Sequence, residues 1–304
     1  MAWKISHMPD LDGKRAVVTG ANAGLGFYTC LHLAKAGASV VLATRNETAG
    51  HEAADRIRND VPGAVLDVVR VDLADLSSVR TAAAVILKQD RPIDMLINNA
   101  GVMATPKRLT LDGFELQFGT NHLGHFALTG LLLPALGSAR VVTVSSLLHN
   151  SVAGVPDRDP REARKYNKWQ AYGESKLANL MFMLELDRRA QVAGLELTSV
   201  AAHPGYASTR LQRSGPRLGG PSMAAYLLAG LTSVVSQSAD AGAWPTLYAA
   251  TAPKMAGGTY IGPSRLMEMR GRPQPVGMSK AARDRDAARR LWLRSQEATG
   301  VSYL

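Results

Sequence analysis

The sequence predicts one α/β domain in which a doubly wound parallel sheet of about seven strands is covered by helices on both faces. Two observations predict this fold. Short apolar segments alternate with helical segments along the chain, as expected for parallel strands that are buried on both faces. The 304 residues are 46% hydrophobic and 20% charged, which is ordinary for a globular protein with one large core and no second domain.

The predicted elements follow one another without internal repeats or low-complexity segments. Strands are expected at 15–19, 39–44, 65–71, 95–97, 140–145, 198–202 and 259–261. Helices are expected at about 24–36, 46–59, 75–89, 111–136, 170–193, 222–235, 238–251 and 280–298. Because sheets of this kind bind ligands beyond the carboxyl ends of their strands, the residues that follow each strand are candidates for a site.

The first predicted strand ends in a glycine-rich turn. Gly20, Gly24 and Gly26 follow the apolar run 16–19, and a helical segment comes next. Glycine permits a tight turn and a close approach of the backbone to a pyrophosphate, and the N–H groups at a helix start attract that anion. An ordinary glycine-rich turn would match the spacing too. The position directly after the first strand favours a nucleotide site.

Tyr172 and Lys176 are the leading candidates for chemistry. They lie four residues apart in a segment with helical periodicity, so their side chains share one face of the helix. A neighbouring ammonium favours the phenolate and lowers the tyrosine pKa from its ordinary value near 10 toward the range that proton transfer needs. Alone the spacing is weak, because a Tyr and a Lys on a solvated face would match it equally well.

Taken in order, the motifs resemble those of the short-chain dehydrogenase/reductase family. They run nearly end to end, as Thr19-Gly20-x-x-x-Gly24-x-Gly26, Asp72-Leu73, Asn98-Asn99-Ala100-Gly101, Asn121, Val144-Ser145-Ser146, Tyr172-x-x-x-Lys176 and His203-Pro204-Gly205. Within that family, segments 121–126 and 166–179 are similar to the retinol-dehydrogenase-like branch. The resemblance implies a one-domain Rossmann fold, a nicotinamide cofactor, and interconversion of a carbonyl and an alcohol by hydride transfer.

The resemblance also implies a role for each catalytic residue. Tyr172 would move the proton, while Lys176 would lower its pKa and bind the nicotinamide ribose. Asn121 would bend its helix and hold a water that connects Lys176 to solvent. Ser146 would hydrogen-bond the substrate oxygen. Ser145 stays an alternative, because an insertion before the tyrosine prevents a check of the register.

Cofactor contacts are implied beyond most of the strands. Asp72 would contact the adenine, although an Asp there can also cap the next helix. The small residues at 99–101 would let the backbone lie against a ribose, and the loop 203–205 would lie near the nicotinamide. The full expected set is Gly20, Asn22, Gly24, Leu25, Gly26, Arg45, Asp72, Leu73, Asn99, Ala100, Gly101, Tyr172, Lys176, Pro204, Gly205 and Thr209.

Arg45 favours NADP(H) over NAD(H). An NAD site usually has an acidic residue at the end of the second strand, where it bonds the ribose 2′-hydroxyl. Here Thr44 occupies that position and Arg45 follows it, and an arginine can accommodate a 2′-phosphate. The glycine turn contributes no second basic residue, because Asn22 is uncharged.

Three segments depart from a minimal domain of this kind. Residues 149–170 are expected to form a surface insertion; Tyr166 within it has Gln170, not a lysine, four residues further on. Residues 206–242 are expected to form a substrate lid, whose apolar helix at 222–235 suggests an apolar substrate. Packing of that helix in a core or between subunits is an equal alternative, so a homo-oligomer is left open. Residues 263–304 are expected to form a basic C-terminal extension.

Composition argues against several other classes of protein. One cysteine, Cys30, excludes an internal disulfide framework and fits a reducing compartment. No apolar run has the length of a membrane span, and we expect a cytoplasmic protein. The net charge of +10 comes with no nucleic-acid motif, so specific nucleic-acid binding is not expected. His122, His125 and His203 lack a completing carboxylate or cysteine, so no metal site is expected.

The sequence therefore predicts an NADP(H)-dependent oxidoreductase acting on an apolar small molecule of the retinoid, steroid, long-chain aldehyde or quinone type. A non-catalytic NADP(H)-binding sensor or scaffold on the same fold is the alternative, because fold alone does not fix function.

Overall fold

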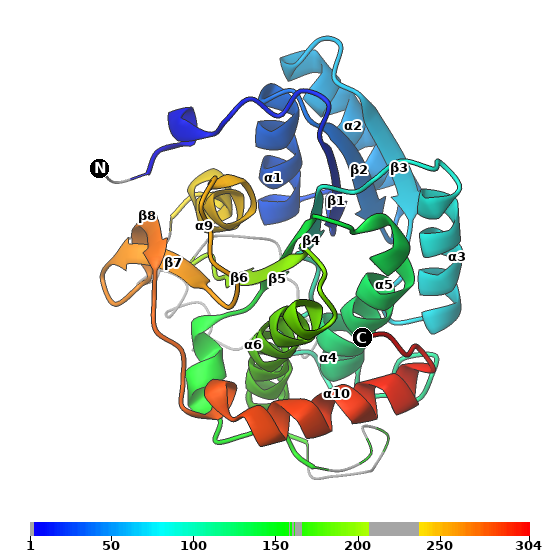
Figure 1. The fold of residues 1–304 in the computed structure, drawn as a ribbon, viewed down its shortest axis with the longest axis vertical. Coiled ribbons are helices and arrows are strands. Elements are labelled where there is room, and N and C mark those ends of the chain that lie inside the picture. The colour runs from blue at the N-terminus through cyan, green and yellow to red at the C-terminus, as the bar shows by residue number, and fades with distance from the viewer. Residues whose placement is uncertain (1–2, 158, 160, 162–165, 207–236) are drawn as a thin grey trace.

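A computed structural model describes residues 3–157, 159, 161, 166–206 and 237–304 (Figure 1). Most of the segment expected as a substrate lid, including the helix expected at 222–235 and Thr209, lies outside these described residues. None of the helices in the described ranges combines the length and the apolar character that a membrane crossing requires.

The sheet has eight strands in the order β3-β2-β1-β4-β5-β6-β7-β8, one more than predicted. Strands β1 to β7 pair in parallel, and β8 pairs antiparallel with β7. The strands are β1 (Arg15–Thr19), β2 (Ser39–Thr44), β3 (Leu66–Arg70), β4 (Met95–Asn98), β5 (Arg140–Val144), β6 (Thr198–Ala202), β7 (Tyr260–Arg265) and β8 (Arg270–Pro275). Strand β1 lies between β2 and β4, so the strand order reverses there and places a crevice at the carboxyl ends.

Helices cover both faces of the sheet (Figure 1). One face packs α1 (Gly24–Lys35), α2 (Glu47–Asp60) and α9 (Ala239–Thr251), and the other packs α3 (Leu76–Leu87), α5 (Gly124–Leu132), α6 (Lys168–Val192) and α10 (Arg285–Thr299). The side chains of successive strand residues point to opposite faces of the sheet, as those of Val17 and Val18 do. The alternating segments of the sequence thus produce the predicted doubly wound fold, a single Rossmann-like domain.

The helix predicted over 111–136 is wrong as a single element. The structure has a short α4 (Leu116–Phe118), a π-helical turn at Gly119–Leu123, α5, and a 3-10 turn at Leu133–Ala135. Residues before α4 form a turn instead, closed by the bridge between Leu109 and Glu115. The Glu115 carboxylate accepts from the N–H groups of Gln117 and Phe118 and so begins the helix later than periodicity indicated.

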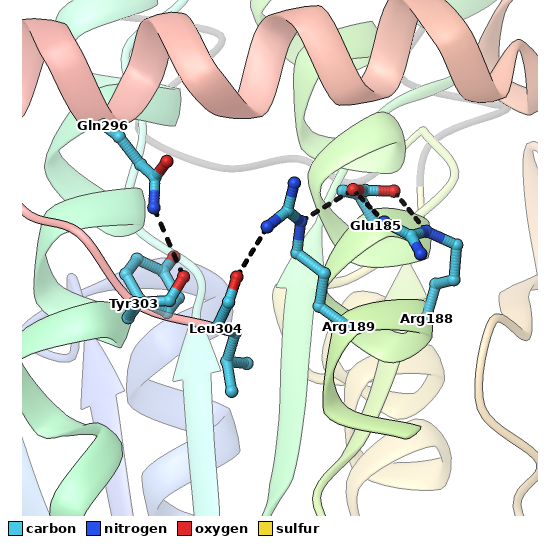
Figure 2. Close-up of polar contacts among 6 residues, drawn as sticks. All are labelled: Glu185, Arg188, Arg189, Gln296, Tyr303 and Leu304. Atoms are coloured by element: carbon cyan, nitrogen blue, oxygen red, sulfur yellow. Dashed lines mark hydrogen bonds and ion pairs between the residues drawn. The ribbon is translucent and has the colours of Figure 1, made fainter. Parts of the chain in front are cut away.

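The C-terminal residues expected as a basic extension contain part of the fold. Strand β8 was not among the predicted strands, because Arg-Gly-Arg-Pro-Gln-Pro has no apolar alternation; proline is tolerated here because the strand lies at the edge of the sheet. Trp292 of α10 is fully buried, and its ring stacks on Phe182 of α6. Figure 2 shows the final residues held to the same region, where Arg189 donates to the carbonyl of Leu304.

The segment expected as a surface insertion is attached to α10 at one point and buried at another. Asp157 pairs with Arg290 at 2.8 Å and with Arg294 at 3.0 Å. His149, at the start of the segment, is buried. Residues 158, 160 and 162–165 lie outside the described part of the chain.

We expect Trp292→Ala to lower the free energy of unfolding by about 3–5 kcal/mol, because it removes a fully buried aromatic side chain. Leu293→Ala, the neighbouring residue on α10 with 51% of its surface exposed, should change it by less than about 0.5 kcal/mol. Urea denaturation followed by circular dichroism measures both. Equal small losses in the two variants would show that α10 is not part of the cooperative core.

Candidate active site

The glycine turn after β1 is shaped for close backbone approach. Gly20 and Gly24 have positive φ values of 65° and 55°. A Cβ on Gly26 would lie 2.3 Å from the carbonyl oxygen of Gly20, so no side chain fits there. The turn leads into α1, whose N-cap residue, Ala23, offers no side-chain acceptor.

That uncapped start of α1 separates it from the other long helices. Helices α2, α3, α6, α9 and α10 each begin with a side chain that accepts from a backbone N–H, supplied by Asn46, Asp75, Asn167, Ser238 and Asp284. The first N–H groups of α1 have no such acceptor and carry the positive end of the helix dipole. These residues therefore fit the pyrophosphate of a dinucleotide.

Thr19 fastens the end of β1 to the end of β4. Its hydroxyl accepts from the N–H groups of Asn99 and Ala100, each at 2.9 Å, and the side-chain amide of Asn99 donates to the carbonyl of Thr19 at 2.7 Å. The Thr19 hydroxyl also bonds Nε2 of His125 at 2.9 Å. The expected cofactor-contacting residues Asn99 and Ala100 are thereby held beside Gly20.

Two predicted contact positions lie beyond β2 and β3. Arg45 is exposed directly after β2, while the buried Thr44 donates to the carbonyl of Asn46. Asp72 accepts from the N–H of Ala74, and the cap of α3 is Asp75, so Asp72 does not cap that helix. Leu73, the next predicted contact, has a buried side chain in the core that includes α3 and α5.

Tyr172 and Lys176 occupy neighbouring turns of α6 beside the end of β5. Both are buried, and the Lys176 ammonium lies 5.8 Å from the centre of the Tyr172 ring and donates to the carbonyl of Val144 at 3.0 Å. The Ser146 hydroxyl acts to lower the pKa of Tyr172 and so lies near the phenol. Ser145 instead donates to the carbonyl of Lys176 at 2.8 Å. The two serines thus face different groups, and of the two only Ser146 acts on the pKa of Tyr172.

Burial controls the ionisation of this pair. It raises the pKa of Tyr172 to about 12, against the opposing effect of the nearby Ser146 hydroxyl. It lowers the pKa of Lys176 to about 8. The expected lowering of the tyrosine pKa by the lysine is not seen, because removal of the phenolate from water is the largest effect on this group.

Asn121 joins three elements around the pair. It lies in the π-helical turn, and such turns are frequent at functional sites. Its amide donates to the carbonyl of Val102 and to the hydroxyl of Ser175, both at 2.9 Å, and accepts from the N–H of Val102 at 2.8 Å. A Cβ on the predicted contact residue Gly101 would lie 3.1 Å from the Asn121 amide oxygen and 3.5 Å from the Lys176 ammonium.

The three histidines considered as metal ligands have separate partners. His125 Nδ1 lies 2.9 Å from the carbonyl of Asn121; because a carbonyl only accepts, Nδ1 carries the proton. His122 lies 2.9 Å from Ser295, and His203 pairs with Glu268 at 3.0 Å. Within the described ranges, no group of three His, Cys, Asp or Glu residues could hold a metal ion.

The loop after β6 lies against the hairpin of β7 and β8. Gly205 has a φ of 63°, and a Cβ there would lie 2.4 Å from the carbonyl oxygen of Met269. The carbonyl of Pro204 accepts from the side chain of Gln237 at 2.6 Å. Both predicted contact residues are thus fixed by residues that the sequence did not single out.

The sequence analysis considered Tyr166 and overlooked His149. Tyr166 donates to the carbonyl of Thr105, away from any lysine partner, in agreement with its missing i+4 lysine. His149, which sequence reasoning missed, donates from Nδ1 to the carbonyl of Ser146 at 2.7 Å and accepts at Nε2 from the N–H of Ser279. Its only signal in the sequence is its place three residues after Ser146.

A buried tyrosine and lysine beside the end of β5 in a doubly wound sheet, together with an uncapped helix start after β1, are the features of a class of dinucleotide-dependent oxidoreductases. The sequence model described as "short chain dehydrogenase" matches residues 14–217. The chain belongs to the short-chain dehydrogenase/reductase family, in its retinol-dehydrogenase-like branch, and is an oxidoreductase of CH–OH and C=O groups.

Several relatives cover nearly the whole chain. Retinol dehydrogenase 13 of Homo sapiens is 39% identical over 298 residues, which span 96% of this chain and 86% of that protein. Polyprenol dehydrogenase of Mus musculus is 38% identical over 301 residues, with 97% and 86% covered. A crystal structure of an uncharacterized protein from Mycobacterium Paratuberculosis is 41% identical, with a TM-score of 0.82 and all of both chains covered.

A fourth comparison is with a solved structure that contains a cofactor. It is described as an NAD(P) dependent gluconate 5-dehydrogenase from Beutenbergia cavernae with bound NADP at low occupancy. It is 27% identical, with a TM-score of 0.63, and the match covers 83% of this chain and 95% of that one.

We expect stability to fall as the pH drops from about 6.5 to about 4. Burial lowers the pKa of His125 to about 4 and that of His122 to about 3, from an ordinary 6.5, so between these values the unfolded chain binds protons that the folded chain does not. Each such histidine contributes a slope of about 1.4 kcal/mol per pH unit.

His125→Gln should reduce the slope of the free energy of unfolding against pH by about 1.4 kcal/mol per pH unit, because one proton fewer is taken up on unfolding. Urea denaturation at a series of pH values measures this slope. His51→Gln changes an exposed histidine of α2 and serves as the control. Its slope should equal that of the wild-type protein. Identical slopes for the wild-type protein and His125→Gln would contradict the assignment of a neutral, buried imidazole.

Proposed function

We propose that this protein is an NADP(H)-dependent oxidoreductase that interconverts a carbonyl and an alcohol on an apolar small molecule. The observation that carries the proposal is the buried pair of Tyr172 and Lys176 on α6, with the Lys176 ammonium 5.8 Å from the centre of the Tyr172 ring. The uncapped start of α1 supports a bound dinucleotide at the neighbouring strand end.

Tyr172 moves the proton at the substrate oxygen, and Ser146 orients that oxygen by a hydrogen bond. When bound, the nicotinamide supplies or accepts the hydride. Lys176, with its pKa near 8, is charged in most molecules at neutral pH, and its ammonium would bind the nicotinamide ribose. Asn121 holds the loop at Val102 and the helix at Ser175 in place, and Asn121, Ser146, Tyr172 and Lys176 form the proposed catalytic set.

The choice of NADP(H) rests on Arg45. Its exposed guanidinium follows β2 at the position where a 2′-phosphate would lie, and no acidic side chain occupies the end of that strand. The related structure from Beutenbergia cavernae, which holds NADP, agrees with this choice.

The substrate class rests on the relatives. Their names give retinol and polyprenol as alcohols, both long apolar isoprenoids, and this chain matches them over 96% and 97% of its length. We therefore propose a substrate of retinoid or polyprenol type before steroids, long-chain aldehydes or quinones. The role of residues 206–242 as a lid, the assembly into homo-oligomers and a cytoplasmic location stay predictions.

Tyr172→Phe should abolish turnover and leave the affinity for NADPH within about twofold, because only the oxygen that transfers the proton is lost. Tyr166→Phe, which changes a tyrosine bonded to Thr105 and Gln117, should keep most of the activity. Turnover is measured from the absorbance of NADPH with retinal as the probe, and the affinity for NADPH is measured by calorimetry. Tight NADPH binding by a wild-type protein that turns over no aldehyde, ketone or quinone would instead favour the non-catalytic sensor.

Arg45→Asp should reverse the cofactor preference. In the wild-type protein NADPH should bind more tightly than NADH by about 1.5–3 kcal/mol, the range for a charge-assisted contact with phosphate. The aspartate would repel the 2′-phosphate and could accept from a ribose hydroxyl. Calorimetric titration with both cofactors tests this, and equal affinities in the wild-type protein would remove the basis for NADP(H).

A further inference from the structure

Part of the basic C-terminal sequence lines a second hollow of about 620 Å³, outside the proposed active site. It lies between the last turns of α6 and the first turns of α10. Four arginines and two carboxylates line it: Arg188, Arg189, Arg285, Arg289, Glu185 and Asp286. The volume falls within the range of about 300–1,000 Å³ that is typical of small-molecule sites.

This hollow lies far from Tyr172. Arg189 follows Tyr172 by 17 residues on the same helix, and a rise of about 1.5 Å per residue separates the two by about 25 Å along its axis. Tyr172 lies near the start of α6, beside the carboxyl ends of the strands, and the hollow is at the opposite end of the helix. A cofactor in the proposed active site therefore does not account for these arginines.

Two of the arginines are held in place by a buried carboxylate (Figure 2). Arg188 donates to Glu185 at 2.8 and 2.6 Å, and Arg189 donates to it at 2.7 Å. Although burial acts to raise the pKa of Glu185, the two guanidinium groups keep it below its ordinary value, so the carboxylate stays charged. Arg189 also donates to the carbonyl of Leu304 and lies over the Trp292 ring at 4.7 Å.

The remaining two arginines are not explained by folding. Arg285 and Arg289 lie four residues apart on one face of α10, are exposed, and form no ion pair with the described residues. Arg285 is the first residue of α10, where a positive charge opposes the helix dipole. Among the side chains that line the hollow, four are positive and two are negative, and the Leu304 oxygen that accepts from Arg189 lies beside them.

We propose that this hollow binds a phosphate-bearing ligand. The planar guanidinium groups present paired N–H donors that match phosphate oxygens, and those of Arg188 and Arg189 are already oriented by Glu185. The exposed apolar side chain of Val192 forms part of the same wall and suits an organic group attached to the phosphate. A soluble phosphate ester and the phosphate headgroup of a lipid share this chemistry.

The test compares three full-length proteins: wild type, Arg285→Gln/Arg289→Gln, and Lys35→Gln/Lys88→Gln. The last variant loses the same charge from two exposed lysines at the ends of α1 and α3. With NADPH present at saturation to occupy the dinucleotide site at α1, calorimetry with inorganic pyrophosphate should show binding to the wild-type protein and the lysine variant, and at least tenfold weaker binding to the arginine variant. Thermal melting confirms that each variant folds, and NADPH titration should give the same affinity in all three.

Vesicle co-sedimentation separates the two sources of phosphate. Vesicles of phosphatidylcholine containing phosphatidic acid should retain the wild-type protein, and not the arginine variant, if the ligand is a lipid headgroup. Pyrophosphate binding without vesicle binding assigns a soluble ester. Equal binding by all three proteins to both probes, or no binding of either probe to the wild-type protein, overturns the proposal.

Discussion

The hydroxyl of Thr19 is the contact on which the geometry of the site depends. It accepts from the backbone of Asn99 and Ala100 and bonds His125, and so it joins the ends of the two central strands to α5. Parallel strands that diverge at a switch point place their loops around a ligand site. The Thr19 hydroxyl holds the glycine turn after β1 beside the loop after β4, which continues to Val102 and its bonds with Asn121.

From His125 the same network continues to the catalytic helix. The imidazole donates to the carbonyl of Asn121 in the π-helical turn, and the Asn121 side chain bonds Ser175 of α6. A polar chain through a dry interior is stable only when every member has a partner, because an unpaired buried group costs about 1–3 kcal/mol. The π-helical turn places the Asn121 side chain where it satisfies backbone groups of Val102 as well.

The fold could be predicted because buried parallel strands are apolar throughout. β1, β2 and β6 lie at the predicted bounds, and the other predicted strands differ by a few residues. The predictions of secondary structure fail where a side-chain hydrogen bond interrupts a helix, or where a strand at the edge of the sheet lacks the apolar pattern. β8 is an edge strand with two prolines, and the helix at 111–136 is interrupted by the side-chain bonds of Asn121 and the cap at Glu115.

The sequence predicted which residues lie in the site better than it predicted their partners and their ionisation. Spacing placed Tyr172 and Lys176 on one helix face, but the register of Ser145 and Ser146 needs three-dimensional information, because the two hydroxyls point to different partners. The ionisation of Tyr172 depends on burial, which a local motif does not report. His149 contacts Ser279, which is 130 residues away in the sequence, and no local sequence pattern predicts such a contact.

The late position of α10 in the chain has a consequence for folding during synthesis. Its Trp292 covers the aromatic face that α5 and α6 present through Phe126 and Phe182. A ribosome completes those two helices about a hundred residues before it reaches Trp292, so the nascent chain carries an uncovered aromatic surface over that interval. A newly made molecule therefore loses this exposed aromatic surface only when its last helix docks.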